Sequence, residues 1–478
     1  MSVRGAKRVL GPDGRPVAVA QRRRMARLLR ARYDAAVTND DNRRHWANAD
    51  NLSADAAANP EVRRTLRNRA RYEVANNSYA RGIIETLAND VVGTGPRLQL
   101  LTADSDLNQT IEREFARWAQ AVGLARILRV MRKAKVTDGE AFALFTRNPG
   151  LDARVQLDLR LVEADQVSTP NLSILDPNAV DGIVFDEFGN PVEYHLLKSH
   201  PGDNDAAFSL EYDRLPAASV IHYYRVDRPG QSRGIPDITP ALPLFAQLRR
   251  YTLAVIAAAE TAADFAAVIY SEMSPDEDTP PEPMDVIELE QRMATVLPAG
   301  WKLGQIRAEH PSTTYAEFKK EILNEIARCL NMPFNIAAAN SADYNYASGR
   351  LDHQTYFKAI RVERDDIEQI VLNRVFREWI NEAALIEGYL PRAARVRNAD
   401  LPVQWFWDGF EHVDPAKEAN AQATRLASNT TTLAAEYARQ GRDWEIELRQ
   451  RAREKDLMRE LGLTDEQADT FDDGGDAE

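Results

Sequence analysis

Two carboxylates two positions apart are the first residues in this chain that could do chemistry. Asp138 and Glu140 flank Gly139, and side chains at i and i+2 of a strand lie on one face, as an acid pair requires. Their neighbours on that face would be Phe142 and Leu144, and carboxylates at such positions usually meet water at a strand edge. We therefore expect surface charges at Asp138 and Glu140, with an acidic site as the alternative.

The other candidates for catalysis or metal binding show no recognised spacing. His195 and His200 flank Lys198 near a turn, and the seven histidines are scattered. Cys329 is the only cysteine and has no histidine nearby in the sequence, so we expect a buried structural thiol. There is no phosphate-binding G-x-x-x-x-G-K run and no H-E-x-x-H. We expect no catalytic residue, no metal, no cofactor and hence no enzyme.

A polar segment between two helices is the most informative stretch of the sequence. Phe318, Ile322, Ile326 and Leu330 recur every four residues and predict one apolar helix face, which Pro333 ends. Residues 334–345 are then rich in small and polar side chains, and either Asn345 or Ser348 could cap the next helix. Such a loop is either an interaction site or a surface connector, and both readings stay open.

Composition narrows the class of protein. The 478 residues are 44% hydrophobic, enough for two to four domains with real cores, and the net charge of −13 argues against a surface that grips nucleic acid all over. The longest apolar stretch, 253–270, contains Glu260 and Asp264, so we expect no membrane span and a protein that is cytoplasmic when made. Residues 1–45 are rich in arginine and residues 464–478 are acidic, which is typical of solvated tails.

Periodicity and turn signals predict a helix-rich α+β chain. Helices are expected over 62–91, 112–121, 124–136, 238–265, 285–295, 315–331, 346–380, 415–440 and 443–461. Strands are expected from 98, over 141–147, 155–162, 182–185, 192–197 and 220–224, from 268, and through 303–306. Gly441 is expected to end the helix before it.

Five short strings occur in one order along the chain. They are Arg69-x-Arg71 with Asn76-Asn77-x-Tyr79-Ala80 and Asn89-Asp90-Val91-Val92-Gly93-Thr94-Gly95; Asp138-Gly139-Glu140; Pro216-Ala217, Val220-Ile221-His222 and Arg228-Pro229-Gly230-Gln231-Ser232-Arg233-Gly234-Ile235-Pro236; Asn345-Tyr346-Ala347-Ser348-Gly349-Arg350; and Val413-Asp414-Pro415-x-Lys417-Glu418-Ala419-x-Ala421. With these strings the chain resembles bacteriophage portal proteins of the family typified by the portal of phage lambda. Ala347 and Gly349 depart from that family's usual letters.

The resemblance implies a phage portal fold, assembled as a homo-oligomeric ring, commonly a dodecamer, around a channel for double-stranded DNA at one capsid vertex of the virion. It implies DNA packaging and ejection, with terminase large subunit, head–tail adaptor and major capsid protein as partners. The implied regions are an Arg-rich arm (1–58), an α/β wing (59–237), a first stem helix (238–267), a clip (268–311), a second stem helix (312–333), a tunnel loop (334–345), a long wing helix with its return segment (346–412), a helical crown (413–463) and an acidic tail (464–478), expected to be disordered.

A ring of helices can be checked against the width of DNA. Helices about 10 Å across leave a bore of roughly 28 Å if twelve form the ring, and of roughly 9 Å if six do. A duplex needs around 20 Å. Twelve helices therefore fit a DNA channel and six do not.

The resemblance also implies the residues of the site. The channel side of the tunnel loop would carry Asn335, Asn340, Ser341, Asp343, Tyr344 and Asn345. DNA-backbone contacts would come from Lys319, Lys320 and Arg350, and docking of terminase or adaptor from the clip residues Asp276, Glu277, Asp278 and Glu282. The alternatives are a capsid-associated adaptor or scaffold without a channel, and a DNA-packaging enzyme.

Overall fold

The computed structural model describes residues 36–168, 178–203, 211–263, 267–271, 301–305, 314–342, 344–391, 401–409 and 415–463. By its internal contacts the chain divides into two units, Met1–Ala57 and Ala58–Glu478. In the first unit the described residues form turns and the short helix α2, Ala54–Ala57. All elements below belong to the second unit.

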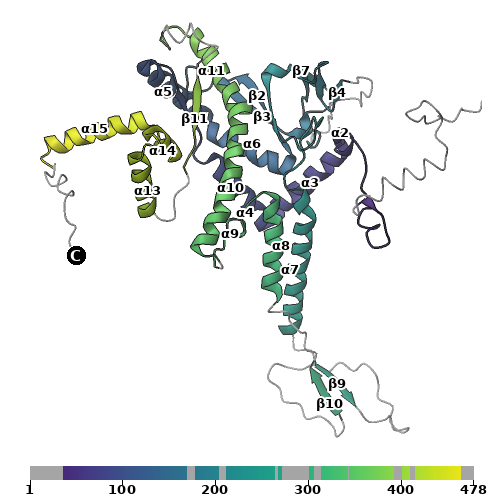
Figure 1. The fold of residues 1–478 in the computed structure, drawn as a ribbon. Coiled ribbons are helices and arrows are strands. Elements are labelled where there is room, and N and C mark those ends of the chain that lie inside the picture. Colours follow the sequence, from purple (N-terminus) through teal and green to yellow (C-terminus); the bar gives the residue numbers. More distant parts are fainter. Residues whose placement is uncertain are drawn as a thin grey trace, which may run out of the picture. The chain divides into compact units, whose positions relative to one another are not determined.

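Four helices open the second unit: α3 (Pro60–Asn76), α4 (Ser78–Val92), α5 (Ser105–Val122) and α6 (Leu124–Asp138) (Figure 1). The single helix expected over 62–91 is wrong, because Asn77 adopts an extended conformation between α3 and α4. Its side chain accepts hydrogen bonds from the amides of Tyr79 and Ala80 and so caps α4. The helix expected over 112–121 begins earlier, where Asp104 caps α5.

Antiparallel strands follow. In the described part of the chain, β2 (Glu140–Arg147) lies between β3 (Leu157–Val162) and β8 (Val220–Tyr224). A second sheet has the order β4 (Ala179–Val180), β5 (Ile183–Phe185), β6 (Pro191–Leu197) and β7 (Tyr212–Pro216). Strand β1 (Arg97–Leu100) pairs with β11 (Val403–Phe406). The predicted strands are confirmed. Strands β4, β7 and β11 were not predicted, because β4 is very short and β7 and β11 lack the alternation of apolar and polar residues, carrying charged or aromatic residues instead.

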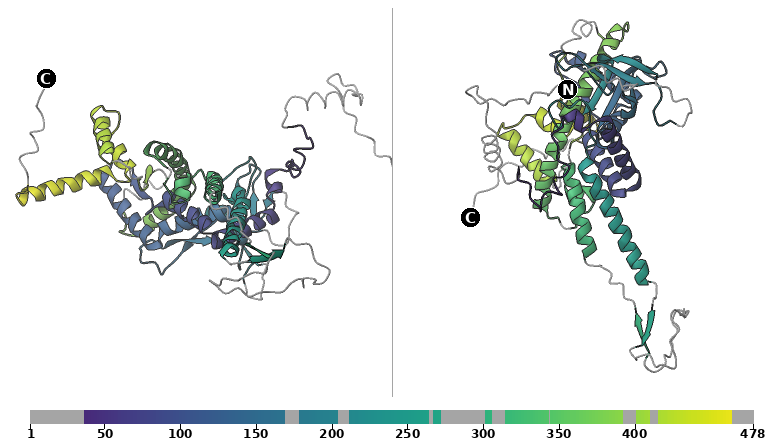
Figure 2. Two further views of the ribbon diagram at one scale, coloured as in Figure 1. Left: turned by 90° about the horizontal axis from the view of Figure 1, so that it is seen from below. Right: turned by 90° about the vertical axis from the view of Figure 1, so that its right-hand side faces the viewer.

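Two long helices lie side by side and run in opposite directions, α7 (Leu242–Ala263) and α8 (Thr314–Cys329) (Figures 1 and 2). Pro243 stands in the first turn of α7, where a missing amide proton costs least. The chain between them includes the antiparallel pair β9 (Ala267–Ser271) and β10 (Trp301–Gln305). The predicted helix 285–295 lies outside the described residues.

After α8 comes the one-turn helix α9 (Phe334–Ala337), and then α10 (Tyr346–Ile367), a π-helical turn (Glu368–Leu372) and α11 (Asn373–Leu385). The helix predicted over 346–380 is confirmed, with the π-helical turn as an unpredicted interruption. Along it Ile367, Val371, Val375 and Trp379 are fully buried, as the spacing predicts.

The C-terminal helices are α13 (Pro415–Ala427), α14 (Leu433–Arg439) and α15 (Trp444–Glu460). The single helix expected over 415–440 is wrong: the chain turns at Asn429, which has φ +54°, and Thr432 caps α14. Gly441 has φ +71° and separates α14 from α15, as predicted.

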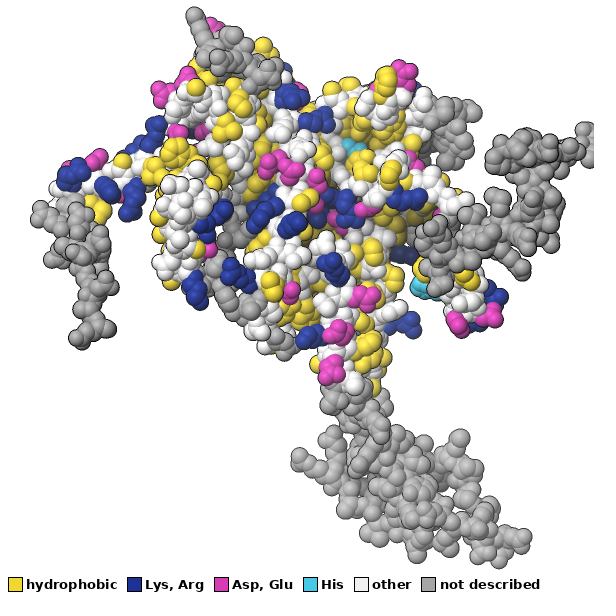
Figure 3. Space-filling view, in the orientation of Figure 1, with side chains coloured by type: hydrophobic (Ala, Val, Ile, Leu, Met, Phe, Trp, Pro, Cys, Tyr) yellow, Lys and Arg dark blue, Asp and Glu magenta, His cyan; other side chains and the backbone are white. Residues whose placement is uncertain are grey.

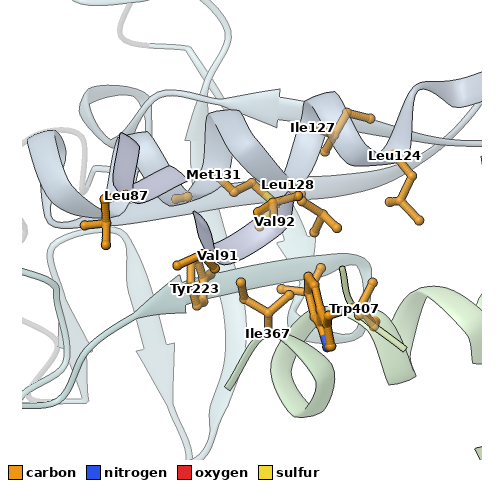
Figure 4. Close-up of a cluster of buried hydrophobic side chains, with 14 of the residues drawn as sticks. Leu87, Val91, Val92, Leu124, Ile127, Leu128, Met131, Tyr223, Ile367 and Trp407 are labelled. Atoms are coloured by element: carbon orange, nitrogen blue, oxygen red, sulfur yellow. The ribbon is translucent and has the colours of Figure 1, made fainter. Parts of the chain in front are cut away.

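Two hydrophobic clusters organise the described residues, one on each face of β2. Ala141 and Ala143 point into the larger cluster, which includes Leu87, Met131 and Ile367 (Figure 4). Phe142 and Leu144 point to the opposite side and pack with residues of β5, β6 and β8. A strand buried on both faces therefore lies at the centre of this unit. None of the described helices is both long and apolar enough to span a membrane.

Candidate functional site

The expectation that Asp138 and Glu140 are surface charges is wrong. The side chain of Glu140 is fully buried and accepts hydrogen bonds from Arg233 Nη2 at 2.6 Å, Arg233 Nε at 2.8 Å and the amide of Gly234 at 3.1 Å. His222 Nε2 lies 3.1 Å from Glu140 Oε2. Gly139 makes this possible: at φ +93° it turns the chain from α6 into β2 directly beneath Gly234. Burial opposes the charged form of Glu140, but Arg233 and His222 outweigh it and hold its pKa well below the ordinary value.

Arginines of α3 extend this buried network. Arg71 Nε lies 2.7 Å from Asp138 Oδ1, and its Nη2 lies 2.7 Å from Asp165 Oδ2. Arg67 reaches the other oxygen of Asp165 at 2.9 Å, and Arg63 pairs with Asp181, which also accepts from Arg233. These four arginines pair with the carboxylates of Asp138, Glu140, Asp165 and Asp181, and Arg71 also reaches the exposed Glu163. This network joins α3, β2 and the loops at 165, 181 and 233, and we assign it a structural role rather than acid–base chemistry.

His200, Glu163 and Asp165 form a group that has the geometry to hold a metal ion. The guanidinium of Arg71 already lies 3.2 Å from Glu163 and 2.7 Å from Asp165, so a cation neutralises these carboxylates. The group carries no metal assignment, and the expectation of no metal stays a prediction.

Gly230-Gln231-Ser232-Arg233-Gly234 has the spacing G-x-S-x-G. A nucleophile elbow requires a sharp turn directly from a strand into a helix. Here the string lies in the connection between β8 and the 3-10 turn Thr239–Ala241. Gln231 and Arg233 are buried structural residues. The string therefore folds as part of the network around Glu140 and does not form an elbow.

The polar segment 334–345 begins as helix, which the sequence did not predict. Ala337 is buried, and Phe334 and Ile336 pack against the larger hydrophobic cluster. The Nδ2 atom of Asn335 lies 3.0 Å from His353 Nε2 on α10. Asn335, expected on the channel side, therefore faces the neighbouring helix instead.

The exposed part of the segment is its second half. Asn340 and Ser341 are exposed, and Asn340 Oδ1 accepts from the amide of Ala342 at 3.0 Å. Asn345 caps α10 reciprocally with Ser348: its Oδ1 accepts from the Ser348 amide at 2.9 Å, and its own amide donates to Ser348 Oγ at 3.2 Å. Tyr344 is half-buried, and burial together with Asp352 raises its pKa. Asp343 lies outside the described residues.

Two of the three cations that we expected to contact DNA lie close to aromatic rings. The Nζ atom of Lys319 lies 5.0 Å from the centre of the Tyr79 ring, and that of Lys320 lies 5.8 Å from the Phe334 ring. Both lysines are half-buried, and their expected contact with a DNA backbone stays a prediction. Arg350, in the first turn of α10, is exposed as expected. The expected docking residues Asp276, Glu277, Asp278 and Glu282 lie outside the described residues.

Exposed charges of both signs lie on α8 and α10. On α8 they are Glu317, Glu321, Glu325 and Arg328, and on α10 they are Arg350, Asp352, Lys358, Arg361 and Asp365. Both signs are visible side by side in Figure 3. The sequence marked the first half of α10 as densely charged but could not show which charges face outward.

Like Arg364, Glu363 is a charged residue of α10 that points inward. Its Oε1 accepts from Lys135 Nζ of α6 at 2.6 Å and lies 3.4 Å from Arg132 Nε, and the Tyr223 hydroxyl of β8 also donates to it. Burial opposes its charged form, but Arg132 and Lys135 outweigh burial and lower the pKa of Glu363 to about 2. This carboxylate therefore fastens α10 to α6 and β8.

Comparison with known proteins decides the family. The family described as phage portal protein, lambda family, matches residues 23–364. The chain belongs to the lambda family of phage portal proteins. This match confirms the resemblance inferred from the sequence. Portal proteins are structural proteins, and this chain is a member of that structural family.

A relative and two solved structures are similar to this portal-family chain. A probable portal protein of Halomonas phage phiHAP-1 is 28% identical over 411 residues, which cover 79% of this chain and 77% of the relative. A chain of the virion of a native gene transfer agent particle is 13% identical with a TM-score of 0.44, covering 80% of this chain and 94% of that one. An HK97 family phage portal protein from Corynebacterium diphtheriae is 10% identical with a TM-score of 0.31, covering 73% and 97%.

Proposed function

We propose that this portal-family chain forms a ring of twelve copies around a channel for double-stranded DNA, and that residues 339–342 stand at the constriction of that channel. The observation that carries the proposal is that residues 339–342, which we call the tip, are exposed and uncharged and lie between helices α9 and α10. Asn340 and Ser341 have no charge with which to grip phosphate. A tip of this kind contacts a sliding duplex without reading its bases or stalling it.

The anchoring of α10 supports the role of a fixed constriction. Arg364, which is buried, donates from Nε to the carbonyl of Val91 at 2.9 Å and from Nη2 to the carbonyl of Asp90 at 3.0 Å. The Tyr356 hydroxyl donates to Asp90 Oδ2 at 2.8 Å. With the capping box at Asn345, these contacts hold the C-terminal end of the tip to α4. Of the three expected cations, we retain Arg350 as a weak, sequence-independent phosphate contact.

The remaining parts of the proposal follow from the family. The ring would sit at one vertex of the virion capsid, with α7 and α8 as the stem and the region 268–311 as the clip. The major capsid protein, the terminase large subunit and the head–tail adaptor are the proposed partners. An adaptor or scaffold without a channel is the rival reading, and it predicts particles without a central hole.

Electron microscopy of the purified full chain, combined with a packaging assay, tests this proposal. The test variant is Asn340→Ala with Ser341→Ala, and the matched control is Asn324→Ala, an exposed amide on α8. Asn345 is excluded because it caps α10.

All three proteins are expected to form rings with a central hole, and only the loop variant should package or retain less DNA. Rings without a hole would refute the channel. Loss of ring assembly in the loop variant alone would refute a role of the tip in handling DNA.

A further inference from the structure

A cavity of about 840 Å³ lies between α15 and the body of the second unit, outside the polar segment and the buried networks. Its walls come from β1, α5, the start of α6 and the N-terminal half of α15. Three contacts between described residues hold α15 there: Arg97 Nη1 to the carbonyl of Gly441 at 2.8 Å, Gln99 Nε2 to Asp443 Oδ2 at 2.6 Å, and Arg449 Nη2 to Ser105 Oγ at 3.1 Å.

The cavity combines an apolar floor with a basic rim. Leu98, Phe115, Leu124 and Phe406 contribute to the floor. Among the described residues that line it there are seven arginines against three carboxylates, a net charge of +4. Within the described part of the chain neither Arg126 nor Arg453 makes an ion pair, and both are exposed. Such a lining suits a short acidic peptide that carries an aromatic residue.

The chain itself contains such a peptide directly after α15. Residues 464–478 carry seven carboxylates, no lysine or arginine, and one aromatic residue, Phe471. Phe471 lies eight residues beyond Leu463, a reach of up to roughly 27 Å if extended. Arg453 lies ten residues before Leu463, or roughly 15 Å along a helix. Residues 464–478 are thus long enough to double back to the cavity.

We propose that the acidic C-terminal segment 464–478 binds in this cavity of its own chain, with Phe471 on the apolar floor and the carboxylates on the arginine rim. The return path passes Leu457, Met458 and Leu461, apolar residues of α15 and its end that are exposed in the structure. Their spacing places them on one side of the helix, and an exposed patch of this kind is usually covered by a partner. The inference does not depend on the proposed DNA channel.

Chemical cross-linking in the full chain tests the proposal. In a Cys329→Ser background, Thr470→Cys is combined with Ala116→Cys, which lines the cavity, or with Arg117→Cys as the matched control. Residues 116 and 117 are exposed neighbours on α5, but Arg117 does not line the cavity. A short bis-maleimide is added, and the rate of intrachain cross-linking is measured on denaturing gels.

The Ala116→Cys pair is expected to cross-link about tenfold faster than the Arg117→Cys pair, because docking raises the local concentration of residue 470. This preference should fall in about 1 M salt, where the screening length is about 3 Å, and in an Arg126→Glu, Arg453→Glu variant. Normal elution and circular dichroism of that variant confirm that it folds.

Three outcomes would overturn the proposal. One is equal rates for the two pairs, and another is a preference that persists after both charge reversals. The third is cross-linking only between chains, which would place the acidic segment of another copy in the cavity.

Discussion

The contact of Glu363 with α6 and β8 offers a quantitative test of how α10 is held. Glu363→Gln keeps the shape of the side chain and removes its charge. Arg132 would keep Asp237 Oδ2 at 3.0 Å as a partner. Lys135, with a side chain only 1% exposed, would keep the Tyr223 ring, its hydroxyl at 3.5 Å, the neutral oxygen of the new amide and the weaker interaction with Asp366. The substitution therefore removes the carboxylate that contacts this buried ammonium directly.

The size of the effect follows from the pKa of Glu363, which falls from an ordinary 4.5 to about 2 in the folded chain. A depressed carboxyl pKa means that the charged form is favoured by folding, so this contribution is present above pH 4.5 and is lost as the pH falls toward 2. The difference between the two pKa values corresponds to roughly 3 kcal/mol at neutral pH. Breaking a buried pair costs about 3–5 kcal/mol, so we expect a loss in that range.

The assay is urea unfolding at fixed protein concentration, followed by tryptophan fluorescence, at pH 7 and then at lower pH. The matched control is Glu61→Gln, whose carboxylate pairs with Arg64 at 2.5 Å on the surface. We expect the control to change the free energy of unfolding by less than about 0.5 kcal/mol. The gap between the wild-type chain and Glu363→Gln should narrow as the pH falls below 4.5.

Two results would refute this reasoning. If Glu363→Gln at pH 7 costs no more than Glu61→Gln, the buried pair does not fasten α10. If the gap is the same at pH 3 as at pH 7, the stabilisation does not come from the ionised carboxylate, and packing of the side chain must account for it.

Two further substitutions test single positions by urea unfolding. Gly139→Ala should lower the free energy of unfolding by at least about 2 kcal/mol more than Gly230→Ala does. A Cβ at residue 139 would lie 2.6 Å from the carbonyl carbon of Ile235, whereas residue 230, also at positive φ, has open space. Equal losses of stability would show that φ alone matters. Asn345→Ala should cost about 1 kcal/mol and Asn345→Asp much less, because both Asn and Asp accept the Ser348 amide as a helix cap; an equal loss in both variants would argue against the cap.

Local patterns predicted most of the elements. Alternation over 141–147 predicted β2, and the four-residue spacing of Phe318, Ile322 and Ile326 predicted α8. Either of two residues was expected to cap α10, and Asn345 and Ser348 do so together. These features depend on neighbours within a few positions, which the sequence places directly.

The wrong prediction for Asp138 and Glu140 has a physical cause. Both were expected to be exposed to water, because a charged side chain is normally solvated. Glu140 is stabilised in the interior chiefly by Arg233, 93 positions away, which supplies its countercharge. Lys319 lies over Tyr79, which no local pattern connects to it.

Short motifs and periodicity along the chain predicted the family, most of the helices and strands, and the place of the polar segment between two helices, because these features depend on neighbours in the sequence. The folded structure was needed to show which charges are buried, which face outward on α10, and that a basic cavity lies beside α15. Those properties depend on side chains brought together from distant positions, and the energy of a charge depends on whether water or a partner surrounds it.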